Sequence, residues 1–207
     1  MRRPLVLVIS GPSGAGKGAL CQGLLAAHPE LRFSVSVTTR KPRAGEVDGS
    51  SYFFVTPERF REMVREGELL EWVEIYGNMY GTPRRWVEDT LAAGRDVLMD
   101  LEVQGGLRVK RCFPEAVLVF VVPPSLKEME RRLRERGTET EEELRRRMEE
   151  ATQLLQYAAR YDYLVVNDDL QRAVEVVSCI IEAERHRTER QDLSFLGRWG
   201  RKGGASG

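Results

Sequence analysis

Residues 11–18 read Gly11-Pro12-Ser13-Gly14-Ala15-Gly16-Lys17-Gly18, with the spacing Gly-x4-Gly-Lys of a phosphate-binding loop. Residues 5–9 are all apolar, as in a parallel strand buried on both faces. After the loop, apolar residues recur at the spacing of one helix face. In this context the loop N–H groups and the helix N-terminus form an anion cradle, to which the lysine adds a mobile charge. The stretch predicts nucleoside triphosphate binding, because an ordinary glycine-rich turn does not explain the lysine.

One position departs from the usual pattern of such a loop. A serine or threonine normally follows the lysine, because its hydroxyl ligates magnesium. Here Gly18 and Ala19 follow Lys17, so neither of the next two residues carries a hydroxyl.

Composition bounds the fold and the partners. The 207 residues fit one domain, and 32 basic residues balance 32 acidic ones, which argues against a general nucleic-acid or membrane-surface binder. Cys21, Cys112 and Cys179 lack metal-site spacing, and their helical contexts predict buried, reduced thiols. No apolar run reaches membrane-spanning length, and we expect a cytoplasmic protein without a secretory leader.

The order of elements predicts an α/β fold. Strand-like runs at 96–100, 116–122 and 163–166 alternate with helical patterns, which indicates a parallel sheet covered on both faces. The block 35–82 is instead strand-rich with short connections and predicts a small β flap. Ligands of such sheets bind at the carboxyl ends of the strands, so the loop, Asp100 and Asn167 should converge there.

Two arginines mark the loop that opens the flap. Arg40 and Arg43 lie three residues apart in a proline-bearing segment, and both guanidinium groups can bind one phosphate, with the hydroxyls of Ser36 and Tyr52 beside them. A solvated basic turn is the alternative, because arginine is common in surface loops.

A single carboxylate interrupts an apolar strand in the same block. Glu71 precedes Trp72, and Tyr80, Gly81 and Thr82 follow shortly after. A carboxylate here is either exposed or paired. Guanine presents N1–H and an exocyclic amine side by side, and one carboxylate accepts from both, whereas adenine has no N1–H. Such a site rejects the wrong base because a buried charge would be left unpaired. Alternatively, Thr82 caps a helix that begins at Pro83.

Five segments together closely resemble the guanylate kinases, in the family's order and spacing, from about residue 5 to residue 187. They are 33–46 (FSVSVTTRKPRAGE), 71–72 (EW), 77–82 (GNMYGT), 103–105 (VQG) and 136–142 (RGTETEE). The resemblance implies transfer of the terminal phosphoryl group of ATP to GMP, with Mg²⁺, giving ADP and GDP. It also implies a P-loop core with a GMP-binding flap and a helical lid.

The same resemblance implies a division of the chain. We expect one domain over 1–190, with a core of 1–34, 83–135 and 148–190, a flap of 35–82 and a lid of 136–147. Residues 191–207 are glycine-rich and basic towards their end and predict a disordered tail.

Site residues follow by matching positions to the family's motifs. The ATP phosphates are expected on 11–18, with Lys17 as the mobile charge and Asn167 near the adenine; Arg132 is a weaker candidate for packing on adenine. Asp100 matches the acid that orients magnesium through water. The GMP phosphate set is Ser36, Arg40, Arg43, Tyr52 and Tyr80; the guanine set is Glu71, Thr82 and Glu102; the catalytic set is Lys17, Arg40, Arg43, Arg136 and Arg147.

The implied chemistry needs no protein nucleophile, because an oxygen of the GMP phosphate attacks in line and the protein supplies position and positive charge. Two departures from the family bear on it. Without a hydroxyl at 18 or 19, we expect weaker metal binding or a higher magnesium requirement. Glu102 replaces a usual aspartate and is one methylene longer, and we expect guanine selectivity to survive through Glu71.

Two other functions remain open. Some guanylate-kinase-like domains are protein-binding scaffolds, but they degrade the loop and the lid, whereas Lys17, Arg40 and Arg147 are present here. A related kinase of a phosphorylated sugar would not need the base-reading set. ATP and GMP are the expected partners, nucleic acid and membrane are not, and the oligomeric state is left open.

Overall fold

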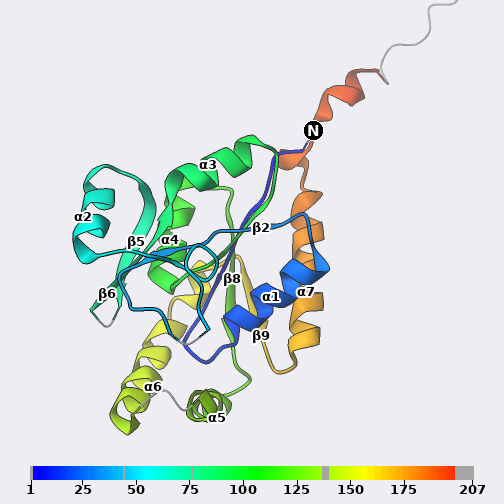
Figure 1. The fold of residues 1–207 in the computed structure, drawn as a ribbon. Coiled ribbons are helices and arrows are strands. Elements are labelled where there is room, and N and C mark those ends of the chain that lie inside the picture. The colour runs from blue at the N-terminus through cyan, green and yellow to red at the C-terminus, as the bar shows by residue number, and fades with distance from the viewer. Residues whose placement is uncertain (1, 44, 76, 137–139, 199–207) are drawn as a thin grey trace, which may run out of the picture.

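The computed structural model describes residues 2–43, 45–75, 77–136 and 140–198 (Figure 1). Its main sheet is five-stranded with the order β2-β7-β1-β8-β9, and all of its strand pairs are parallel. The central strand β1 is buried along its whole length, as its unbroken apolar sequence predicts. The strands are β1 (Val6–Ser10), β2 (Arg32–Phe33), β7 (Val97–Asp100), β8 (Val117–Val122) and β9 (Tyr163–Val166).

Helices cover both faces of this sheet. On one face α1 (Lys17–Ala27) and α7 (Leu170–Arg185) share a buried cluster that contains Leu24 and Val177. On the other, α3 (Arg84–Ala92) and α4 (Val103–Cys112) contribute to a second cluster. The predicted α/β class with a covered parallel sheet is therefore confirmed.

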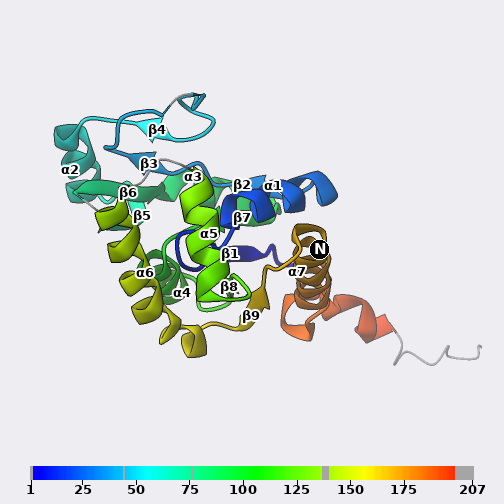
Figure 2. The ribbon, with the colours of Figure 1, turned by 90° about the horizontal axis from the view of Figure 1, so that it is seen from below.

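The flap has a sheet and a small core of its own. Its sheet is four-stranded with the order β4-β3-β6-β5, and α2 (Pro57–Arg65) packs on it through Phe60 and Met63. In both ribbon views the flap and α7 lie at opposite sides of the molecule (Figure 1; Figure 2). The strands are β3 (Val37–Thr38), β4 (Phe53–Phe54), β5 (Leu69–Ile75) and β6 (Asn78–Pro83).

The alternating, β-prone residues 32–38 form two short strands in different sheets, β2 and β3. The backbone N–H of Ser34 donates to Leu98 O in the main sheet, whereas Ser36 O accepts from Phe53 N in the flap. The chain therefore changes sheets between Ser34 and Ser36, and an alternating sequence pattern does not mark that change.

Capping residues set several helix boundaries. Thr56 caps α2 by accepting from Arg59 N, and Thr140 with Glu143 forms a complete capping box at α6 (Glu141–Leu155). At α5 (Leu126–Arg136), Ser125 accepts from Glu128 N, but the Glu128 carboxylate pairs with arginines of the same helix.

Two local predictions are wrong. Pro83, not Thr82, is the N-cap residue of α3, because the Thr82 side chain lies in β6 and bonds elsewhere. Cys21 is buried, but Cys112 and Cys179 are exposed, since they lie on the solvent sides of α4 and α7. The tail is partly described: residues Leu193–Arg198 form a 3-10 helix, and 199–207 lie outside the described residues.

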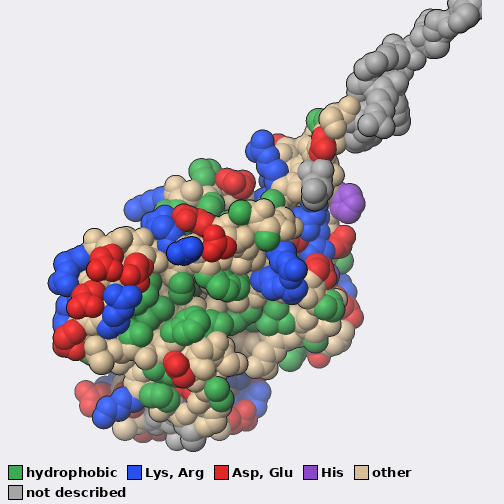
Figure 3. All heavy atoms as spheres, turned by 45° about the horizontal axis from the view of Figure 1, so that its top comes forward, with side chains coloured by type: hydrophobic (Ala, Val, Ile, Leu, Met, Phe, Trp, Pro, Cys, Tyr) green, Lys and Arg blue, Asp and Glu red, His purple; other side chains and the backbone are tan. Residues whose placement is uncertain are grey.

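Charge is mixed on the face of the molecule drawn in Figure 3. On the face in Figure 3, basic and acidic side chains are interspersed, and no large patch of one sign forms there. Within the described ranges, none of the helices combines the length and apolar character needed to cross a bilayer.

Candidate active site

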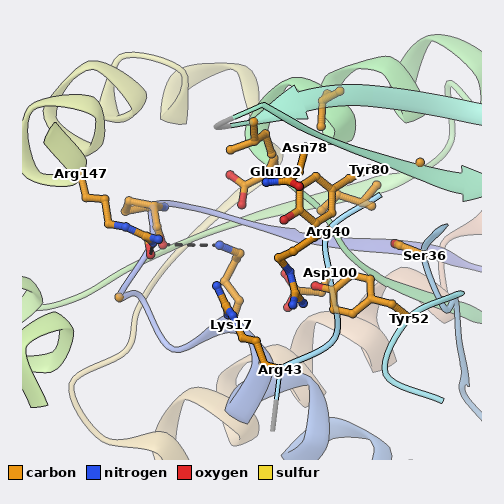
Figure 4. Close-up of a pocket in the computed structure, with 18 of the residues that line it drawn as sticks. Lys17, Ser36, Arg40, Arg43, Tyr52, Asn78, Tyr80, Asp100, Glu102 and Arg147 are labelled. Atoms are coloured by element: carbon orange, nitrogen blue, oxygen red, sulfur yellow. Dashed lines mark hydrogen bonds between the residues drawn. The ribbon is translucent and has the colours of Figure 1, made fainter. Parts of the chain in front are cut away.

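A cavity of about 720 Å³ lies between the phosphate loop, the flap, the end of β7 and α6. The labelled side chains of Figure 4 converge on it from these four places. The expected convergence of the loop with Asp100 at strand ends is therefore seen. The predicted residues that line this cavity include Pro12, Ser13, Gly14, Gly16, Lys17, Gly18, Ser36, Arg40, Arg43, Tyr52, Glu71, Tyr80, Asp100, Glu102 and Arg147.

Backbone geometry shapes the phosphate loop. Gly14 and Gly16 adopt φ values of 85° and 86°, which favour glycine, and a side chain at Gly11 would begin 2.0 Å from Val121 O. The Lys17 ammonium donates to Gly11 O at 2.8 Å, so it lies over the loop that it is expected to serve. The curled loop and this ammonium present positive charge to the cavity.

Asn167 lies behind the loop. It is 4 % exposed, and its side-chain amide donates to Ala15 O at 2.8 Å. The Arg132 guanidinium in turn donates to Asn167 O at 2.9 Å. The structure thus places Asn167 as a support of the loop, with one N–H of its amide group engaged there.

The phosphate-facing side of the flap centres on Arg40. Its guanidinium makes two bonds to the Glu46 carboxylate, at 2.8 and 2.9 Å, and lies 5.3 Å from the centre of the Tyr52 ring. Glu46 also accepts from Arg43 N, and its bonds with Arg40, despite partial burial, lower the pKa of Glu46. Sequence reasoning gave Glu46 no role, although it lies three residues after Arg43, a spacing that permits the backbone contact.

Glu71 is the buried carboxylate of the site. It is 5 % exposed; Oε1 accepts from the Thr82 hydroxyl at 2.8 Å, and Oε2 has no hydrogen-bond partner among the residues that the structure describes. Burial raises the pKa of Glu71 to about 6, an effect that the bond from Thr82 and the charge of Arg108 reduce. Of the two readings open from sequence, the structure supports a buried, half-paired carboxylate. Thr82 is joined to the site by its bond to Glu71.

Two acids stand at the end of β7. Asp100 and Glu102 line the cavity; burial raises the pKa of Asp100, Lys17 opposes that shift and Glu102 adds to it. Among the described residues no three His, Cys, Asp or Glu side chains cluster as a metal cage. Mg²⁺ prefers oxygen donors and keeps several waters, so an acid such as Asp100 beside a phosphate cradle fits it as a water-mediated partner.

The lid reaches the loop through α6. Arg147 donates from its guanidinium to Ser13 Oγ at 2.7 Å, which joins α6 to the phosphate loop. Glu143 and Arg146, which sequence reasoning left out, also line the cavity from this helix. Arg136 ends α5, but its side chain lies outside the described residues, as do lid residues 137–139.

Comparison with known proteins gives a consistent result. The family model for guanylate kinase matches residues 1–184. The guanylate kinase of Caldanaerobacter subterraneus subsp. tengcongensis is 48% identical over 195 residues, covering 94% of this chain and 95% of that protein. The guanylate kinase of Desulfitobacterium hafniense is 49% identical over 193 residues, covering 93% and 96%. The crystal structure of guanylate kinase from Anaplasma phagocytophilum superposes with a TM-score of 0.79 at 32% identity, covering 95% and 94% of the two chains.

Proposed function

The chain belongs to the guanylate kinase family, and from that premise we propose that it transfers the γ-phosphoryl group of ATP to GMP, giving ADP and GDP. The observation that carries the proposal is the Glu71 carboxylate, which is buried in the same cavity as the phosphate loop and whose Oε2 has no hydrogen-bond partner in the described part of the chain. A cavity that joins a triphosphate cradle to a base-reading carboxylate suits a nucleotide acceptor better than a sugar.

On the acceptor side, Glu71 receives the two guanine donors, and the Thr82 hydroxyl holds the carboxylate in place. Glu102 contacts the base from the end of β7. Arg40 binds the phosphate while Glu46 keeps its guanidinium oriented. The remaining phosphate ligands that we assign are Ser36, Arg43, Tyr52 and Tyr80.

On the donor side, the amides of residues 11–18 and the Lys17 ammonium hold the ATP phosphates. We assign Asn167 to the adenine side of the site; its amide also donates one N–H to Ala15 O, which leaves the second N–H and Oδ1 for the base. Asp100 is the protein group that orients Mg²⁺ through water. Bound Mg²⁺ would neutralise charge on the transferring phosphates.

The chemistry then rests on position and charge. With the two phosphates aligned, an oxygen of GMP attacks the γ-phosphorus while the bond to ADP breaks. Lys17, Arg40, Arg43 and the lid arginines Arg136 and Arg147 offset the negative charge that converges there. We propose that the flap 35–82 and the lid 136–147 close over the cavity and exclude water, which suppresses ATP hydrolysis.

The cellular setting follows from the substrates. We place the enzyme in the cytoplasm, with ATP and GMP as partners. A net charge of zero favours neither nucleic acid nor a membrane surface as a further partner.

A coupled ADP-release assay with ATP and GMP, dGMP, AMP or UMP tests the function. We expect turnover with GMP and dGMP, because both carry guanine, and far slower turnover with AMP or UMP. A protein-binding module would give no turnover with any acceptor. A sugar-phosphate kinase would give none with GMP.

A further inference from the structure

Two adjacent glycines, Gly105 and Gly106, lie in the first turns of α4. Glycine is among the least favourable residues inside a helix, so a pair of them needs a reason. Neither adopts a positive φ, unlike Gly14 or Gly16, so backbone conformation does not supply that reason. Both are buried, and the space around them explains their presence.

The two glycines make room for different neighbours. A Cβ at Gly105 would lie 2.8 Å from Glu71 Oε2 and 3.3 Å from Glu71 Cδ. A Cβ at Gly106 would lie 2.8 Å from both Ser10 Oγ and Tyr161 Oη. Gly106 therefore lets α4 pack on the sheet, whereas Gly105 lets it approach the carboxylate in the cavity.

We propose that Gly105 is a specificity-determining position that sets where the Glu71 carboxylate lies, an inference that rests on the guanine-reading role proposed for Glu71. The carboxylate is held from two sides. The Thr82 hydroxyl fixes Oε1 at 2.8 Å, and the bare backbone of Gly105 gives Oε2 the space beside α4. Since Oε2 has no hydrogen-bond partner among the described residues, packing against Gly105 and the bond from Thr82 to Oε1 together set its position.

A methyl group at this position would displace the carboxylate rather than the helix. Contacts below 3.0 Å with a Cβ are essentially never observed, so one partner must move. Helix α4 is anchored by Val103 and Val109, which are both fully buried, and by Gly106 against the sheet. The Glu71 carboxylate ends a longer side chain that has room on its cavity side. It would therefore shift towards the base and strain its bond with Thr82.

The test compares GMP with IMP as acceptors in the Gly105→Ala variant. IMP keeps N1–H but lacks the exocyclic amine, so the GMP-to-IMP ratio of kcat/KM reports the second hydrogen bond to the carboxylate. We expect this ratio to fall about ten-fold, the effect of one hydrogen bond to a charged group. The KM for ATP should stay within about two-fold, because the phosphate loop is untouched. A fall in kcat/KM that is equal for GMP and IMP would overturn the proposal.

Gly106→Ala is the matched control. It makes the same substitution one residue further along the same helix, with the same 2.8 Å approach to its neighbours, but away from Glu71. We expect it to lower thermal stability and to keep the GMP-to-IMP ratio. A fall in that ratio as large as that of Gly105→Ala would assign the effect to the helix as a whole and overturn the proposal.

Glu71 variants separate this inference from the function on which it rests. Glu71→Gln should also lower the ratio; if it does not, the base-reading role itself fails. If Glu71→Gln lowers the ratio and a folded Gly105→Ala does not, only the inference about Gly105 fails. If Gly105→Ala does not fold, the double variant Gly105→Ala with Glu71→Asp tests whether the clash is the cause, because the aspartate side chain is shorter. Recovery of folding supports the contact between Cβ and carboxylate, and no recovery contradicts it.

Discussion

The two halves of the cavity are built by different means. The ATP half is made of backbone, because Gly14 and Gly16 in positive-φ conformations curl the loop and Lys17 lies over it. The GMP half is made of side chains that hold one another, as Thr82 holds Glu71. One half recognises phosphate, which every nucleotide carries, and the other recognises a single base.

This difference predicts how each half responds to substitution. Backbone amides cannot be removed by changing a side chain, so the loop has one vulnerable group, the Lys17 ammonium. In the flap, side chains that contact the nucleotide are also held in place by one another. A change to one of them should therefore alter the selectivity for the acceptor base. The predictions below test this contrast, from the largest expected effect to the smallest.

Lys17→Met should have the largest effect on catalysis. It removes the loop's own ammonium while keeping a side chain of similar length, and we expect kcat/KM for ATP to fall about 10²- to 10³-fold. The KM for GMP should change little, because no flap contact is lost. Steady-state kinetics with each substrate varied in turn measures both. Lys127→Met, at an exposed lysine of α5, is the control and should match the unchanged protein.

Glu71→Gln should abolish base selectivity and leave the ATP half intact. An amide presents one acceptor and one donor, so a guanine donor would face another donor in a buried site. We expect kcat/KM for GMP to fall about 100-fold and the preference over AMP to shrink with it. Glu74→Gln, at an exposed acid of the same strand, is the matched control. A Glu71→Gln variant that kept full preference for GMP would assign base reading to Glu102 instead.

The pH dependence of GMP binding should also identify Glu71. Burial raises its pKa to about 6, and only the ionised carboxylate accepts from both guanine donors. As pH falls below about 6, the ionised fraction drops about ten-fold per pH unit, so the KM for GMP should rise towards acid and level off above neutrality. The phosphate of GMP titrates in the same range. Glu71→Gln separates the two, because only the part due to Glu71 disappears in that variant.

The stability that Glu71 contributes to folding changes with pH in the opposite direction to GMP binding. A raised carboxyl pKa means that the folded protein binds the proton more tightly than the unfolded chain. The Glu71 contribution to the free energy of unfolding is therefore greatest below the usual pKa of 4.5 and is lost as pH rises through about 6. Above that pH the empty site keeps a buried charge that GMP would satisfy.

The same contrast explains what could be predicted from sequence. The ATP half of the cavity could be predicted because the glycines and the lysine of its loop follow one another along the chain, and each is required by the local backbone geometry. The buried parallel strand could be predicted for the same reason, and the helix caps Thr56 and Thr140 follow equally local sequence motifs. Where a residue is required by its neighbours along the chain, the requirement is visible as a sequence motif.

The parts that could not be predicted depend on tertiary contact. Thr82 was open between capping α3 and serving the base, and only the pairing of β5 with β6 places it on Glu71. Glu46 binds Arg40 across a loop whose path is not encoded by periodicity. Asn167 also donates to Ala15 O in the phosphate loop, a contact over 152 positions of sequence that no local pattern indicates. Gly105 looked like an ordinary helix glycine until Glu71 was placed beside it.

Gly18→Ser should have the smallest effect and would bring a side chain into the backbone half. A Cβ at Gly18 meets nothing within 4 Å, so the serine fits without strain and restores the hydroxyl that such loops usually carry. We expect the Mg²⁺ concentration for half-maximal activity to fall about two- to ten-fold, since one oxygen ligand is added. Gly18→Ala adds the same Cβ without the hydroxyl and should leave the Mg²⁺ requirement unchanged. If both variants respond alike, helix stability at α1 and not metal ligation is the cause, and Asp100 with water already suffices for the metal.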